Sequence, residues 1–174
     1  MLLILTSLTG LKDVNAQANN KHSFSMNFGP ELFVPENDFS ITHKAGAGLS
    51  VKTEYTFGKH ASATFNTGIT FFKGKQQFED FTSPSPTFYK SITALPLKLG
   101  SRYYIGNFYF LGEAGIIVNL NNSLHTKVVF GAGIGDKIKI GYQKLDISLR
   151  QEIWVANRDQ LNMAVLRIAY EITW

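Results

Sequence analysis

Apolar side chains occupy every second position along most of the chain from Ser23 onward. A period of two is typical of a β-strand, because successive side chains of a strand point to opposite faces. The period of 3.6 residues that marks an amphipathic helix is not sustained anywhere. The pattern therefore predicts an all-β protein. The predicted strands cover residues 23–28, 48–57, 63–71, 95–103, 108–120, 128–140, 145–153 and 166–174.

The connections between these eight segments alternate in length. Tight turns follow the second, fourth and sixth predicted strands, whereas the first and third are followed by long connections, among them the proline-containing stretch from Lys73 to Thr87. Short turns at one end of a sheet, with both chain ends on that same side, are typical of single-chain outer-membrane barrels. The lengths therefore favour an eight-stranded antiparallel up-and-down barrel.

Two residues predict irregularities in this barrel. Pro96 lies inside the fourth predicted strand and has no backbone N–H, so we expect a break in the ladder there. Asp136 falls on the apolar face of the sixth, where we expect a β-bulge. A hairpin at Gly135-Asp136 is the alternative, but it would give nine strands and place the chain ends on opposite sides, which bacterial single-chain barrels avoid.

The residue types on the two faces indicate which face is outside. The polar face is rich in Gly, Ser, Thr and Asn with widely spaced charges, whereas a solvated face is crowded with charges; small side chains suit the narrow interior of an eight-stranded barrel. The apolar face carries large residues on every strand, which favours a transmembrane β-barrel over a soluble lipocalin-like carrier with an apolar interior. The residues expected to face lipid are Phe65, Ile69, Leu97, Leu99, Ile116, Phe130, Leu149 and Ile168. The expected interfacial girdles are Tyr55, Phe57, Tyr103, Phe108 and Trp174 on the turn side, and Phe71, Phe88, Tyr89 and Trp154 on the loop side.

Charged residues on the polar face predict an ion-pair network in the barrel interior. Together with Asp146 the two signs balance, and an unpaired charge in a narrow interior would be costly. An ion path is the alternative, but eight strands leave little room for a water-filled channel. Lys127, Lys137 and Lys139 add positive charge to the interior or its rim if the sixth predicted strand keeps its phase. The predicted network comprises Lys52, Glu54, Lys98, Arg102, Glu113, Arg150, Glu152, Arg167 and Glu171.

Composition narrows the function classes. The chain has no cysteine, which excludes disulfides and thiolate metal sites, and its 13% aromatic content argues against disorder. The net charge of +4 is spread along the sequence, and basic residues do not alternate with aromatic ones on an exposed face, so we expect no nucleic-acid partner.

The first residues predict a secretory signal peptide. An apolar run from Met1 to Leu11 precedes two small-x-small patterns that end at Ala16 and Ala18. We expect residues 1–18 to be the signal peptide and residues 19–174 to form the barrel. A short buried helix or an interfacial anchor is the alternative interpretation.

Candidate chemistry is sparse, and we expect no enzyme, no cofactor and no metal site. The four histidines are scattered, and none has a second ligand at metal spacing. Gly131, Gly133 and Gly135 continue a strand instead of opening a helix, so they are not a dinucleotide fingerprint. Ser123 and His125 share one face at the loop rim, and the alternative function is therefore an interfacial hydrolase of lipid or lipopolysaccharide.

Several short segments resemble the outer-membrane β-barrel domain family of small eight-stranded barrels. Leu95 to Gly100 with Arg102-Tyr103-Tyr104, Leu111 to Gly115, Phe130 to Ile134 and Leu145 to Ala156 are similar to successive strands of its PorT-like branch, which has the architecture of the OmpA membrane domain. The segment from Ile168 to Trp174, with Tyr170 and the terminal aromatic, is similar to the assembly signal of such barrels. The resemblance implies an outer-membrane location, contact with the bilayer and insertion by the barrel-assembly machinery, but no reaction. It leaves a structural envelope role, or an envelope or secretion partner bound through the loops, as the expected function.

Overall fold

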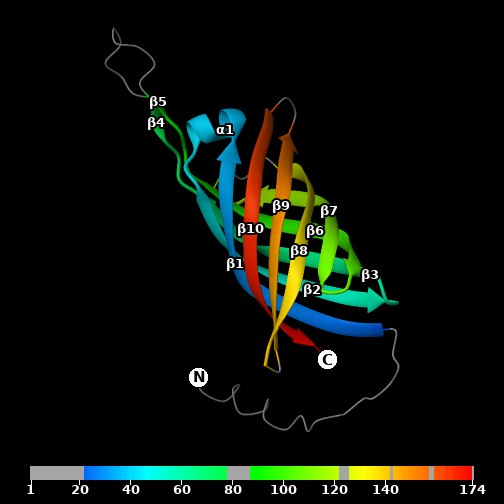
Figure 1. The fold of residues 1–174 in the computed structure, drawn as a ribbon. Helices are drawn as coiled ribbons and strands as arrows, with labels where there is room; N and C mark the ends of the chain where they lie inside the picture. Colours follow the sequence, from blue (N-terminus) through cyan, green and yellow to red (C-terminus); the bar gives the residue numbers. More distant parts are fainter. Residues whose placement is uncertain (1–21, 78–86, 122–125, 142, 157–158, 174) are drawn as a thin grey trace, which may run out of the picture.

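Eight long antiparallel strands close into a barrel in the computed structural model, which describes residues 22–77, 87–121, 126–141, 143–156 and 159–173 (Figure 1). The order around the barrel is β1-β10-β9-β8-β7-β6-β3-β2, and a separate two-stranded sheet pairs β4 with β5. The predicted fold class is therefore confirmed. The elements are β1 (His22–Glu36), α1 (Asn37–Thr42), β2 (Gly46–Phe57), β3 (Ala61–Phe72), β4 (Gln76–Gln77), β5 (Thr87–Phe88), β6 (Ile92–Ile105), β7 (Phe108–Asn119), β8 (Lys127–Ile140), β9 (Gln143–Ala156) and β10 (Asp159–Thr173).

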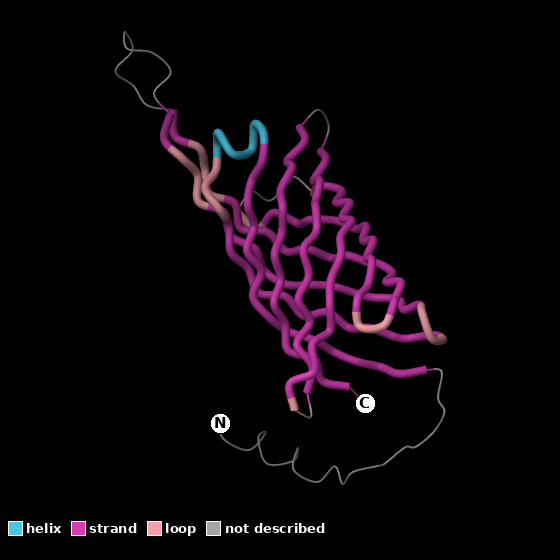
Figure 2. The backbone as a smooth tube through the Cα atoms, viewed as in Figure 1, coloured by secondary structure: helices cyan, strands magenta, loops and turns pink. Residues whose placement is uncertain are grey.

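The two ends of the barrel differ. Tight turns that contain a glycine with positive φ, at Gly58, Gly106 and Gly141, join strands at the end where the described chain begins and finishes. At the other end α1 follows β1, and the paired strands β4 and β5 project beyond the barrel rim (Figures 1 and 2). In outer-membrane barrels short turns lie in the periplasm and longer loops lie outside the cell. We call these the turn end and the loop end.

β1 is longer than predicted. It continues through Gly29 and Pro30, where the pattern alone ended the strand, and it pairs with β2 without interruption. Its pairing with β10 runs from Ser25↔Thr173 to Glu36↔Asn162 but skips Gly29 and Pro30. Proline cannot donate to the ladder, so the strand continues by leaving this one gap at the seam.

Of the two predicted irregularities, one is confirmed and one is wrong. The pairing of β3 with β6 skips from Thr67↔Leu97 to Thr70↔Ala94, which leaves Pro96 without a partner on that side. Asp136, by contrast, pairs in register with Phe108 and with Ile147, so there is no bulge. Because Phe108 is the first residue of β7, Asp136 lies at the barrel rim, where a carboxylate can reach water without distorting the strand.

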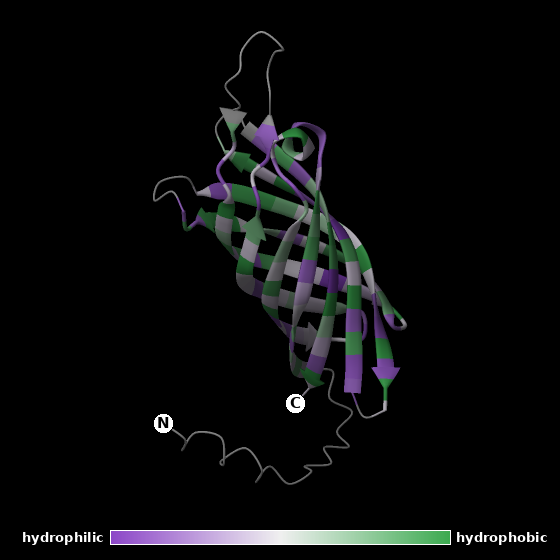
Figure 3. Cartoon of the chain, turned by 90° about the vertical axis from the view of Figure 1, so that its left-hand side faces the viewer, coloured by the Kyte–Doolittle hydropathy of each residue, from purple (hydrophilic) through white to green (hydrophobic). Residues whose placement is uncertain are grey.

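Large apolar side chains cover the outside of the barrel. Hydrophobic and hydrophilic residues alternate along its strands (Figure 3). Of the eight residues predicted to face lipid, seven are exposed on this surface and Leu97 is half-buried. The soluble lipocalin-like alternative is wrong, because charged and polar side chains, not apolar ones, fill the central part of the interior.

The interior nevertheless has an apolar layer that the pattern did not predict. At the loop end, inward-facing side chains of seven strands and of α1 form one buried cluster. Its members are Phe33, Phe39, Phe72, Ala94, Ile117, Val129, Trp154, Met163 and Val165. Trp154 was predicted to lie in the outer girdle, and this is wrong: it shares the inward parity of Arg150 and Glu152 and is 1% exposed.

Candidate functional site

All nine residues of the predicted network are buried in the barrel interior, and they come from five strands. Glu113 on β7 lies at the centre. Its carboxylate pairs with Lys52, lies 3.4 Å from Lys98 Nζ and lies 3.8 Å from Arg150 Nε. Glu152 joins the same group, because its Oε1 is 2.5 Å from Lys98 Nζ and 2.6 Å from Arg150 Nε.

Glu31 is a member of this network that the sequence reasoning missed. Arg150 Nη2 and Arg167 Nε lie 2.8 and 3.3 Å from its two carboxylate oxygens, and Ser50 donates a hydrogen bond to it. The alternation of β1 would have placed Glu31 inside had the strand been extended through Pro30. Its carboxylate completes the charge balance on the loop side of the network.

Arg102 holds the part of the network nearer the turn end. Its guanidinium lies 2.9 Å from Glu54 and 2.8 Å from Asp146 and stacks 4.2 Å from the ring centroid of Tyr109. The Tyr109 hydroxyl donates to Asp146, and that of Tyr104 donates to Glu54. These two tyrosines were assigned no role from the sequence.

Lys137 and Glu171 extend the network to the turn end. Lys137 Nζ lies 2.6 Å from Glu171 and 3.0 Å from Glu54, so β8 keeps its phase and directs this lysine inward. Lys144 Nζ lies 3.5 Å from the other oxygen of Glu171.

The buried middle of the network is electrically balanced. It holds five cations and five carboxylates, each within ion-pair distance of an opposite charge. The cations are Lys52, Lys98, Arg102, Arg150 and Arg167, and the carboxylates are Glu31, Glu54, Glu113, Asp146 and Glu152. Buried ions are tolerated only when paired, and this arrangement fills the cross-section with side chains.

The apolar cluster closes the interior above the charges. Phe39 of α1 packs against Phe72, with ring centroids 5.0 Å apart, and Phe72 packs against Trp154 at 5.7 Å. The Trp154 indole donates a 3.0 Å hydrogen bond to Glu152, so the apolar cluster and the ion pairs are joined. Together they obstruct the barrel from its middle to its loop end.

His43 fastens α1 to the loop end. Its Nε2 lies 3.0 Å from the carbonyl oxygen of Lys90, its Nδ1 lies 2.8 Å from the Thr42 hydroxyl, and its ring packs against Phe39. Burial lowers the pKa of His43, and the charge of Lys75 acts in the same direction, although the bond to Lys90 opposes them. The neutral form of the ring is therefore favoured.

Within the described residues, no group of three or more His, Asp or Glu side chains could hold a metal ion. No helix in this part of the chain is long and apolar enough to cross a membrane. Ser123 and His125, on which the hydrolase alternative rests, lie outside the described residues, as does Trp174. Tyr170 lies at the β1–β10 seam, where its ring contacts Phe28 with centroids 5.7 Å apart.

An apolar exterior around a closed antiparallel barrel with ion pairs inside is the arrangement of a transmembrane barrel. A soluble protein would expose this apolar band to water, whereas a bilayer buries it. The chain is therefore a small outer-membrane β-barrel protein.

Comparison with solved structures agrees with this class. The crystal structure of Ail, the attachment invasion locus protein of Yersinia pestis, superposes with a TM-score of 0.51 at 15% identity, covering 87% of this chain and 97% of Ail. The structure of the same outer-membrane protein in a phospholipid bilayer nanodisc gives a TM-score of 0.58 at 14% identity, covering 86% and 99%. No family model matches the sequence, and no curated protein is similar to it. At these identities the likeness concerns the fold.

Proposed function

We propose that the chain is a non-enzymatic outer-membrane protein whose barrel is a scaffold and whose loop end contacts a partner outside the cell. The observation that carries the proposal is the filled interior. The ion pairs and the apolar cluster fill the barrel interior and leave no channel through it. The regions able to bind a partner are therefore those that project from the barrel.

The loop end has the features of an interaction surface. Ile41 on α1 and Phe88 on β5 are 51% and 64% exposed although they lie beyond the barrel strands. Contiguous exposed apolar patches mark protein–protein contacts, and we propose that Ile41 and Phe88 contribute to such a contact. The similar fold of Ail, named for attachment and invasion, is consistent with such a role but does not identify the partner.

We further propose that residues 1–18 direct export and that the barrel-assembly machinery inserts the mature chain. The aromatic Tyr170 near the end of an amphipathic strand supports this, because the resemblance to barrel assembly signals rests on that strand. We also propose that the chain is related to the PorT-like branch of small outer-membrane barrels, on the strand motifs that resemble that branch.

The following test distinguishes the contribution of the loop end to function from that of the barrel body. Cells that lack the protein would be complemented with the full chain or with a variant in which residues 75–89 are replaced by a tight turn. We expect the variant to insert but to leave the phenotype of the deletion unrescued. The matched control is Gly141→Asn at the turn end, where asparagine tolerates the positive φ of this position, and it should rescue. Full rescue by the shortened variant would show that the barrel body suffices and would overturn the loop proposal in favour of a purely structural envelope role.

A second measurement tests the scaffold directly. Purified barrel in a planar bilayer should give no conductance steps, because the narrow interior is filled. Regular conductance steps from the full chain would contradict the scaffold proposal.

A further inference from the structure

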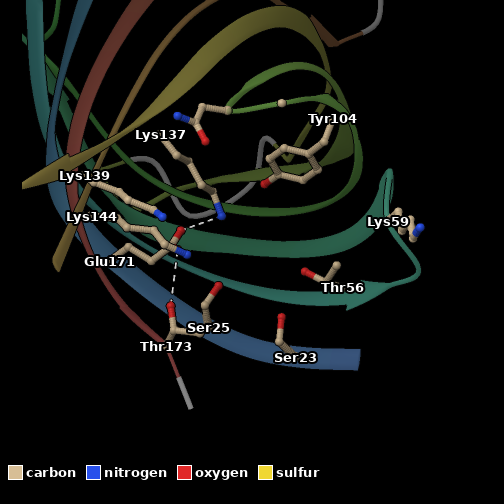
Figure 4. Close-up of a pocket in the computed structure, with 12 residues that line it drawn as sticks. Ser23, Ser25, Thr56, Lys59, Tyr104, Lys137, Lys139, Lys144, Glu171 and Thr173 are labelled. Carbon is tan, nitrogen blue, oxygen red and sulfur yellow. Dashed lines mark hydrogen bonds and ion pairs between the residues drawn. The ribbon is translucent and has the colours of Figure 1, made fainter. Parts of the chain in front are cut away.

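At the turn end of the interior, positive charges outnumber negative charges. Beyond the balanced middle of the network, a hollow of about 220 Å³ opens between the strand ends. Four lysines and one carboxylate line it: Lys59, Lys137, Lys139, Lys144 and Glu171 (Figure 4). The lining therefore carries three more positive than negative charges.

The lysines are brought together by the strand register. Lys139 on β8 is directly opposite Lys144 on β9, and Lys144 is directly opposite Glu171 on β10. Lys137 lies two residues before Lys139 and so faces the same side of β8. Like charges directly opposite each other in a sheet are unfavourable. This arrangement is stabilised when an anion lies between the two ammonium groups.

The available carboxylate does not neutralise this set. Glu171 is shared by Lys137 and Lys144. Neither Lys59 nor Lys139 forms an ion pair within the part of the chain that the structure describes. Asp136 is nearby in sequence but is exposed on the outer face of β8, away from the hollow. The excess charge therefore faces the hollow.

The rest of the lining can donate hydrogen bonds. The hydroxyl groups of Ser23, Ser25, Thr56 and Thr173 and the Asn107 amide also line the hollow. Ser25 and Thr173 lie near Lys137, Lys144 and Glu171 (Figure 4), and the Thr173 hydroxyl donates to Glu171. Ammonium groups combined with hydroxyl donors suit a compact oxyanion with several acceptor oxygens. The hollow has room for such an ion with its water, since a water molecule takes about 30 Å³.

We propose that the turn end of the barrel is a binding site for a phosphate group, presented from the periplasmic side. The same chemistry is offered by free phosphate and by the head group of an anionic phospholipid in the inner leaflet. The proposal is independent of the loop-end function, because it concerns the opposite end of the barrel.

The test uses the full chain in nanodiscs of zwitterionic phosphatidylcholine, titrated calorimetrically with inorganic phosphate. We expect saturable binding that weakens as salt is added. Replacing Lys139 or Lys59 by Gln should weaken it about tenfold each, since a hydrogen bond to a charged group contributes on that scale. Both side chains are exposed, so the variants should fold, and altered gel migration before and after boiling would verify this.

Lys127→Gln is the matched control. Lys127 is on the same strand and the same face as Lys139 but at the loop end. Its replacement should leave phosphate binding unchanged. Equal weakening by Lys127→Gln and Lys139→Gln would show diffuse attraction to a basic protein and would overturn the site.

A second arm distinguishes the two sources. In nanodiscs that contain phosphatidylglycerol, a lipid head group in the site would suppress binding of inorganic phosphate, and Lys139→Gln would reduce the fraction of immobilised lipid in the ³¹P spectrum. Unchanged phosphate binding would assign the site to a free anion. Absence of both phosphate binding and lipid immobilisation in the full chain would contradict the proposal.

Discussion

Glu113 is the single carboxylate on which the middle of the ion network depends. Its neighbours are Lys52, Lys98 and Arg150, and Lys52 has no other ion-pair partner among the described residues. Removing the Glu113 carboxylate leaves Lys52 buried without an ion-pair partner, whereas Lys98 and Arg150 still pair with Glu152. The energetic consequence is larger than the value of any one pair.

We predict that Glu113→Gln destabilises the barrel by about 3–5 kcal/mol, because a buried cation loses its partner. The double variant Glu113→Gln with Lys52→Met should be less destabilised than the sum of the two single variants. Urea unfolding in lipid vesicles measures all three. Gln160→Ala, at an exposed position on β10, is the control and should change little. Strict additivity of the two changes would show that the pair is not coupled.

For individual residues, the sequence predicted side-chain orientation best in strands with one uniformly polar face and one uniformly apolar face. A period of two fixes the face of every residue in a strand, so Arg150, Glu152 and Arg167 could be assigned to the interior. Glu31 was missed because Gly29-Pro30 looked like a strand end. Trp154 was misplaced because its aromatic character suggested an interface, although its parity matched that of the charged residues.

The closing strand β10 is the element on which the barrel depends. It pairs along its length with β9 and, except at Gly29 and Pro30, with β1. Without it, both neighbouring strands would expose unpaired backbone groups to lipid, which is strongly unfavourable.

We predict that deleting residues 170–174 abolishes insertion and leaves a protease-sensitive product in the periplasm. Replacing the connection between Lys73 and Pro86 by a short turn should leave the barrel intact. Membrane fractionation, followed by a gel with and without boiling, distinguishes the products. A truncated chain that reached the outer membrane in a heat-modifiable form would show that β10 is not needed for closure.

The α1 element introduces a pH dependence at the loop end. The pKa of His43 is lower in the folded protein than the ordinary histidine value of about 6.5. The unfolded chain therefore binds the proton more tightly, so this contribution to stability is present above about pH 6.5 and is lost as the pH falls below it.

We predict that acidification releases α1 locally. The backbone amides of Lys44 and Lys75 bond to the carbonyls of Lys73 and Thr42 across this region. Their hydrogen-exchange protection factors should fall below pH 6.5, whereas that of Lys137, at the turn end, should not. The His43→Gln variant should remove the pH dependence. Protection that fell equally at Lys137 would indicate global instability instead.

At the scale of elements, the pattern predicted all eight barrel strands but missed α1 and the β4–β5 pair. These are short, and tertiary contacts determine them: Phe39 anchors α1 by packing against Phe72 and His43. A signal was present at the loop ends, where Phe71-Phe72 and Ile153-Trp154 put two apolar residues in succession. Each pair breaks the alternation and places one apolar side chain inside, which is how the apolar cluster forms.

The whole molecule has the reverse arrangement of a soluble barrel, with charged side chains inside and apolar side chains outside. This arrangement followed from the small and sparsely charged residues of one face and the large residues of the other. The phase of β8 predicted extra positive charge from Lys137 and Lys139, but it did not predict that Lys144 joins them at the turn end, because that depends on how far β8 and β9 extend beyond the rim. That extension places Lys139 and Lys144 in register outside the balanced network.

The chain contains no cysteine, so single cysteines can be introduced on a clean background. The most direct test of the membrane-embedded barrel attaches a spin label at Phe65, Leu99, Phe130 or Ile168 in nanodiscs. Collision of the label with lipid-soluble oxygen is compared with collision with a water-soluble nickel chelate. Ile140, exposed on the part of β8 beyond its pairing with β7, and Ile41 on α1 serve as controls outside the bilayer. We predict that oxygen dominates at the four strand positions and the nickel chelate at the two controls; nickel access at all six positions would contradict a membrane-embedded barrel.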